Sequence, residues 1–248
     1  MDTTEGLASA DDPGVDSAVD HEHPDVTGGW LRPAVFGAMD GLVSNFALIA
    51  GMVGGTGGDN NDLVVLAGLA GLAAGAFSMA AGEYTSVASQ AEFAARQVDV
   101  ERREIVANPV GEAAELAEMY VGKGIDEETA RQMAEQVHAD VERAVAVHAM
   151  EEFGVDPDDL PSPTLAAGSS FLSFAVGAAV PVLPYVLGAN TLLPGLVLTL
   201  LALFGCGAVV ARVTSRPWWY SGLRQLVLGG VAAGVTYLFG SLVGAGLG

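Results

Sequence analysis

Three side chains that can bind or transfer a cation stand inside apolar sequence. Asp40 lies within the first hydrophobic segment, and Met79 and Glu83 lie four residues apart near the end of the second. This spacing puts Met79 and Glu83 on one face of a helix. Antiparallel packing of the two segments would bring all three residues to a similar depth. Because an ionisable group inside a membrane span is costly, we interpret the two acids as functional.

The chemistry of this set fits a divalent cation. Two carboxylates at one depth can share a cation or a proton, and a thioether suits a borderline ion such as Fe²⁺ or Mn²⁺ better than Mg²⁺. Taken alone, Met79 is better explained by core packing. Ser44 and Asn45, which follow Asp40 in the sequence, either line a pore or hydrogen-bond between helices.

A second set of acids lies between the second and third hydrophobic segments. Carboxylates recur at three-residue spacing on two predicted helices, which places each pair on one face, and a third helix ends with His, Met and Glu. These residues are Glu101 and Glu104, Glu112 and Glu115, and His148, Met150, Glu151 and Glu152. Three helices that each offer carboxylates can hold several metal ions. A solvated acidic face would give the same pattern, and spacing alone leaves both readings open.

Five hydrophobic segments must position these residues. They are residues 33–53, 63–84, 165–187, 192–211 and 222–247. Each is near the roughly 20 residues that cross a bilayer core as a helix. The sequence therefore predicts an all-α membrane protein, divided into a disordered acidic tail (1–29), two transmembrane helices (30–87), a helical domain (88–164) and three transmembrane helices (165–248).

The inserted region reads as three helices. The second span continues without a breaker to Ala107, where Asn108-Pro109 ends it. A second helix is predicted over 110–122 and a third over 126–153, with Gly154 as its stop.

Charge is strongly segregated along the chain. The net charge is −20, with eighteen acids and six bases in residues 88–164 and no acid in residues 165–248. Excess acid argues against a nucleic-acid partner, because phosphate would be repelled. With five spans, all ten Lys and Arg residues fall on one side. The positive-inside rule then places the N-terminus and the acidic domain in the cytoplasm of a protein of the cell membrane.

Three stretches resemble the vacuolar iron transporter family. They are RPAVFGAMDGLVS at 32–44, SMAAGEY at 78–84 and PVLPY at 181–185, and the likeness covers about residues 30–247 in family order. The Gly-Glu-Tyr sequence at 82–84 is similar to the prokaryotic branch. Two positions depart from relatives that carry acids there: Pro33 in the first span and Gly71 in the second.

The resemblance implies a homodimer with five spans per subunit that exports Fe²⁺, and often Mn²⁺, from the cytosol in exchange for protons. It implies no permanently bound cofactor, since the metal ion is cargo. The implied transport pathway comprises Asp40, Met79, Glu83 and Tyr185. The implied ligands of a cytoplasmic three-helix metal-binding domain are Glu101, Glu104, Glu112, Glu115, Met150 and Glu152.

Two other classes of function remain as alternatives. A membrane-anchored metal sensor or buffer would bind ions without moving them. A di-iron oxidase would place two Glu-x-x-His motifs in a helical bundle. The chain lacks such a pair of motifs, and we therefore do not expect an enzyme.

Overall fold

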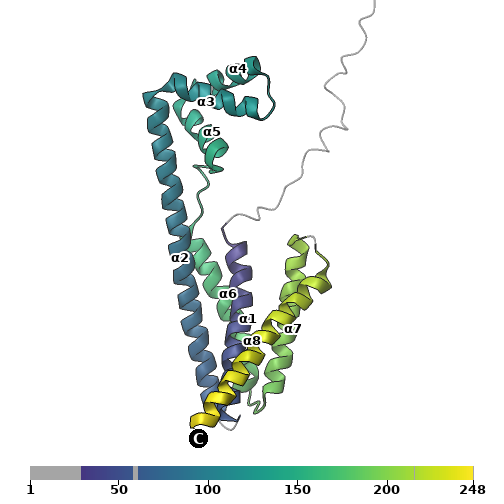
Figure 1. The fold of residues 1–248 in the computed structure, drawn as a ribbon. Coiled ribbons are helices and arrows are strands. Elements are labelled where there is room, and N and C mark those ends of the chain that lie inside the picture. The colour runs from purple at the N-terminus through teal and green to yellow at the C-terminus, as the bar shows by residue number, and fades with distance from the viewer. Residues whose placement is uncertain (1–28, 58–60, 215, 248) are drawn as a thin grey trace, which may run out of the picture.

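Residues 29–57, 61–214 and 216–247 are described by the computed structural model, and within these ranges the chain forms eight α-helices and no strand (Figure 1). The predicted acidic tail falls almost entirely outside them. The helices are α1 (Leu31–Thr56), α2 (Asn61–Ala107), α3 (Pro109–Gly122), α4 (Glu127–Val137), α5 (Val141–Phe153), α6 (Pro163–Val186), α7 (Leu192–Thr214) and α8 (Trp218–Leu247).

Five of these helices are long and apolar enough to cross a membrane: α1, α2, α6, α7 and α8. The predicted all-helical fold with five spans is confirmed. The N-terminal end of α1 and the turn between α7 and α8 lie at the end of the spans that faces helices α3 to α5, and the C-terminus lies at the opposite end (Figure 1).

Helices α1 and α6 approach closely because glycines face each other across their contact. A Cβ on Gly41 would lie 2.3 Å from the carbonyl oxygen of Phe174, and one on Gly177 would lie 2.3 Å from that of Ala38. Small residues permit such backbone contact between membrane helices, where no hydrophobic force drives association. This contact fixes the position of Asp40, one residue before Gly41.

Helix α2 is a single 47-residue rod. At 1.5 Å per residue it is about 70 Å long, more than twice the roughly 30 Å of a bilayer core. Its first half packs beside α1 and α6, and its second half extends past the other spans to reach α3 and α5 (Figure 1). No helix break separates residues 87 and 88, where the sequence suggested a domain boundary.

We call α3, α4, α5 and the C-terminal half of α2 the helical head. The prediction of one helix over 126–153 is wrong, because α4 ends at Val137 and α5 begins at Val141. The Asp140 side chain caps α5 by accepting a hydrogen bond from the Arg143 N–H (2.8 Å). The Arg143 guanidinium in turn donates to the Val137 and Gln136 carbonyl oxygens at the end of α4. Side chains thus hydrogen-bond to backbone groups at the end of α4 and at the start of α5, and the break contains no glycine or proline.

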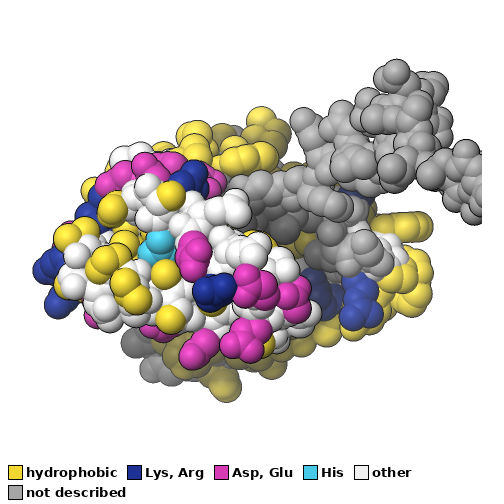
Figure 2. All heavy atoms as spheres, turned by 90° about the horizontal axis from the view of Figure 1, so that it is seen from above, with side chains coloured by type: hydrophobic (Ala, Val, Ile, Leu, Met, Phe, Trp, Pro, Cys, Tyr) yellow, Lys and Arg dark blue, Asp and Glu magenta, His cyan; other side chains and the backbone are white. Residues whose placement is uncertain are grey.

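The head has two small apolar cores. Leu116 and Tyr120 of α3 pack with Ala130 and Ala134 of α4, while Ile105 of α2 packs with two residues of α5, Ala144 and Val145. Asp and Glu side chains cover much of the outer surface of this end (Figure 2). The second core joins α5 to the long rod and so determines which acids meet inside the head.

Candidate functional site

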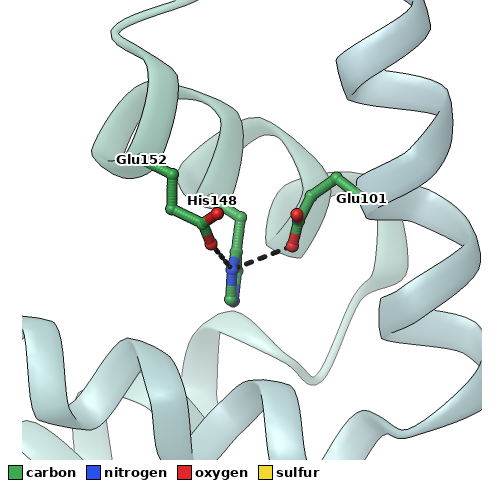
Figure 3. Close-up of side chains that lie close together, drawn as sticks. All are labelled: Glu101, His148 and Glu152. Atoms are coloured by element: carbon green, nitrogen blue, oxygen red, sulfur yellow. Dashed lines mark hydrogen bonds and ion pairs between the residues drawn. The ribbon is translucent and has the colours of Figure 1, made fainter.

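Two carboxylates and an imidazole converge inside the helical head (Figure 3). Nδ1 of His148 lies 3.0 Å from Oε1 of Glu101 and 2.8 Å from Oε1 of Glu152. Glu101 comes from α2, and the other two residues lie one turn apart on α5. We call these three residues the Glu–His–Glu cluster. A nitrogen and two carboxylate oxygens that face one point are a typical donor set for a divalent cation.

The cluster is buried because it lies beside the apolar core between α2 and α5. His148 is 0% and Glu101 3% exposed, whereas the Glu152 side chain is 21% exposed and opens one side to solvent. Ile105, one turn after Glu101, and Ala144, one turn before His148, belong to that core. Side chains of this kind are rarely buried unless they are paired or bind an ion.

Burial and neighbouring acids perturb the cluster's charges. Glu101 lies far beyond the membrane-crossing half of α2, and burial raises its pKa to about 7, with further increases from Glu152, Glu112 and Glu104 that His148 partly offsets. The pKa of Glu112, on α3, is also raised, first by burial and then by Glu115. When a cation binds between carboxyl groups that raise one another's pKa in this way, it stabilises their ionised form.

The six head residues predicted as ligands do not all reach this point. The structure brings Glu101 and Glu152 together, and Glu104 and Glu112 lie close enough to act on the Glu101 pKa. Glu115 acts on Glu112 and is exposed. Met150 is 49% exposed. Because it lies two residues from both His148 and Glu152, about 200° around α5, it points away from the cluster.

Sequence reasoning did not select the residue at the centre of the cluster. His148 was noted near the acids but left out of the predicted ligands. Its spacing of four residues from Glu152 and its apolar neighbours Val145 and Ala149 were the available signals. His138, at the end of α4, was missed entirely, and its ring lies edge-to-face on His148 with centroids 5.1 Å apart.

A second polar site lies between the membrane-spanning parts of α1 and α2. A cavity of about 410 Å³ is lined by Asp40, Ser44 and Asn45 of α1, by Ser78 and Met79 of α2, and by apolar residues. We call it the membrane cavity. Asp40, Ser44 and Ser78 are exposed, so the cavity opens on the surface of the single chain.

Asn45 both joins helices and lines this cavity. Its Nδ2 donates to the carbonyl oxygens of Gly68 (3.1 Å) and Ala178 (2.7 Å), which ties α1 to α2 and α6. Its Oδ1 accepts no hydrogen bond from the residues that the structure describes, although Asn45 is only 2% exposed. A Cβ on Gly71 would lie 2.7 Å from this oxygen. The two readings of Asn45 from sequence are therefore compatible.

Two predicted pathway residues lie away from the membrane cavity. Asp40 and Met79 share it, but Glu83 lies one turn beyond Met79, where its carboxylate is 3.9 Å from the Arg32 guanidinium. The structure thus brings Asp40 and Met79 to one cavity and places Glu83 beside Arg32. Tyr185 is 3% exposed in an apolar cluster with Ile49 and Val64, and its hydroxyl has no hydrogen-bond partner among the described residues.

Comparisons with known proteins indicate a single family. The family model described as the VIT family matches residues 31–241. A vacuolar iron transporter of Acanthamoeba castellanii is 37% identical over 224 residues, covering 87% of this chain and 79% of that protein. Vacuolar iron transporter 1 of Oryza sativa subsp. japonica is 30% identical over 223 residues, covering 88% of each chain.

Proposed function

The chain belongs to the VIT family, and on that premise we propose that it moves Fe²⁺, and also Mn²⁺, out of the cytosol in exchange for protons. The ions gather on the acids of the helical head. They then pass through the membrane at the level of Asp40 and Met79, with Glu83 near the cytoplasmic end.

One observation carries this proposal: the Glu–His–Glu cluster and the membrane cavity lie on the same rod. Helix α2 contributes Met79 to the cavity and Glu101 to the cluster without a break between them. The 22 residues that separate these two positions span about 33 Å at 1.5 Å per residue. A rigid connection of this kind suits a protein that collects an ion at one end and releases it into a pore at the other.

The orientation follows from charge. The bases of the head and those flanking α1 and the turn between α7 and α8 belong to one end of the molecule. The positive-inside rule assigns this end to the cytoplasm. The acidic head would then face the cytosolic pool of metal ions, in a cell membrane that the chain crosses five times.

A homodimer completes the pathway in this proposal. In the most apolar window of α2, 17% of residues are buried, compared with 44% in α1. The uncovered face includes Ser78 beside Asp40 and Ser44, and polar groups that face lipid are costly. A second copy packed on this face would cover these groups and turn two open cavities into one pathway. Tyr185 would act from the core behind it.

Transport is tested by loading sealed liposomes. Purified protein in proteoliposomes should accumulate Fe²⁺ faster with a pH gradient than without one, and Glu83→Gln should slow this uptake strongly. Asp62→Asn is a matched control, because it removes an acid from the first turn of α2, far from the cavity.

The same assay separates a transporter from a sensor or buffer. Both would bind metal in solution, but only a transporter loads the lumen. Binding without uptake by the wild-type protein would refute the proposal, and uptake by Glu83→Gln at the wild-type rate would refute the role of Glu83.

A further inference from the structure

His148 is placed to be a metal ligand rather than a neutral member of the core. Its Nδ1 atom lies between Oε1 of Glu101 (3.0 Å) and Oε1 of Glu152 (2.8 Å), as Figure 3 shows. Donors about 2.1 Å from a cation in adjacent octahedral positions are about 3 Å apart. The two observed separations match that spacing, so a cation could bind between Nδ1 and the two carboxylate oxygens.

Two buried atoms of the cluster lack partners without an ion. A single Nδ1–H can serve one carboxylate, and Nδ1 of His148 is hydrogen-bonded to Oε1 of Glu152. Within the described part of the chain, Oε1 of Glu101 has no hydrogen-bond donor, although the residue is 3% exposed, and Nε2 of the fully buried His148 has no acceptor. Buried polar atoms without partners are rare and call for an explanation. A cation on Nδ1 and both carboxylates would satisfy the orphaned oxygen.

His138 supplies what the other side of the His148 ring would need. When Nδ1 binds a metal, the ring proton resides on Nε2, and ligating histidines almost always donate this proton to an acceptor. Nδ1 of His138 is 2.9 Å from the Ala134 carbonyl oxygen, which requires an N–H there and leaves Nε2 as an acceptor. That Nε2 is buried and unpartnered among the described residues, and the two rings are in contact.

We propose that His148 binds the ion through Nδ1 together with Glu101 and Glu152, and that His138 is a positioning residue that orients the His148 ring. This inference rests on the proposed function, because it concerns the site where the cargo gathers. A site with one imidazole and two carboxylates favours the later first-row ions, Fe²⁺ and Co²⁺, over Mn²⁺ and strongly over Mg²⁺, since imidazole suits the former and pure oxygen sites the latter. The chain therefore collects selectively among divalent ions.

The test identifies the ligand by spectroscopy on the full-length protein. The chain has four histidines, and replacing His21 and His23 with Gln gives a background with only His138 and His148. Less than one equivalent of Cu²⁺ bound to this background should show electron spin-echo modulation from the remote nitrogen of one coordinated imidazole. His148→Gln should remove that modulation, and His138→Leu should keep it.

Selectivity gives a second readout in the same background. His148→Gln should lower Co²⁺ affinity by about tenfold or more and Mn²⁺ affinity by less than about threefold, because only the former depends strongly on nitrogen. His138→Leu should weaken Co²⁺ binding by about tenfold, and His138→Gln, whose amide oxygen can accept the Nε2–H, should restore part of it.

Several results would overturn the inference. They are nitrogen modulation that survives His148→Gln, modulation that disappears only in His138→Leu, and equal losses of Co²⁺ and Mn²⁺ affinity. Circular dichroism of each variant establishes that the head is folded. None of these measurements requires flux, so a chain that binds through His148 but fails to load liposomes would refute transport and leave the ligand assignment standing.

Discussion

The Glu–His–Glu cluster and the membrane cavity differ in how far one chain encloses them. The cluster is largely buried and open to solvent only at Glu152: its donors come from α2 and α5, the other two residues are at least nine-tenths buried, and the donor atoms already face one point. The membrane cavity is open: Asp40, Ser44 and Ser78 are exposed at its rim. Under the proposed function, a single chain would therefore hold a preformed binding site and only part of a passage.

This difference indicates how the two regions divide the work. A buried site with preplaced donors binds tightly and selectively, because little must be reorganised. A passage must let the ion leave again, so it needs fewer and weaker contacts. In the proposed function, the head would determine which ion enters, and the membrane region would determine how fast it crosses. The following predictions address this division.

The largest effect is expected from Asp40→Asn. This substitution removes the acid of the membrane cavity while leaving the head untouched, so the maximal rate of Fe²⁺ uptake should fall by about 100-fold. Metal binding to the purified protein should be unchanged in equilibrium dialysis. Loss of both uptake and metal binding in this variant would contradict the separate roles of the head and the membrane cavity. Asp62→Asn is the control.

The next effect is expected from Glu152→Gln. The loss of one charged ligand should weaken metal binding by roughly 10- to 100-fold, as for other losses around metal sites. Isothermal titration calorimetry measures this directly. The matched control is Glu118→Gln, which removes an exposed acid of α3. Equal losses in the two variants would mean that the head attracts ions only by its net charge.

The pH dependence of metal affinity follows from Glu101. Its pKa is about 7, so the carboxyl group is largely protonated at pH 6 and largely ionised at pH 8. A metal must displace this proton below the pKa, and affinity should therefore rise by about fivefold from pH 6 to pH 7 and by about tenfold by pH 8, where it levels off. Glu101→Gln should bind weakly and show a shallower dependence. An affinity that falls with rising pH would contradict this sign.

The smallest effect is expected from Asp140→Ala. It removes the N-cap of α5 and should destabilise the head by about 1 kcal/mol, with a lower melting temperature in the absence of metal. Saturating metal should recover stability, because the ion binds only the folded head. The exposed Asp158→Ala should leave the melting temperature unchanged. If saturating Co²⁺ does not restore the melting temperature, metal binding at the cluster does not stabilise the head.

The five spans were predictable because hydropathy and charge vary together along this chain. Residues 165–248 contain no acid, and the glycine-rich spans are of bilayer length, so length and composition were sufficient. The break between α4 and α5 was not foreseen, since no glycine or proline marks it. It depends on the Asp140 cap and on the long-range donors of Arg143, and an Asp inside a helical pattern reads equally well as a surface residue.

The site was predictable in composition but not in geometry. Spacing placed Glu101 and Glu104 on one face, yet only packing against α5 distinguishes the buried acid from the exposed one. The same packing turns His148 inward and Met150 outward. The expectation that Glu83 lies beside Asp40 rests on counting residues along each helix. Such counting cannot give the relative shift of two helices.

The division between collecting and passing is tested most directly by the concentration dependence of initial Fe²⁺ flux into proteoliposomes. For Glu152→Gln, we predict a half-saturating concentration that rises by about tenfold with a maximal rate near that of the wild type. For Asp40→Asn, we predict a maximal rate that collapses with little change in half-saturation. If both variants change the same parameter by similar factors, the cluster and the cavity are not separate stages of one pathway.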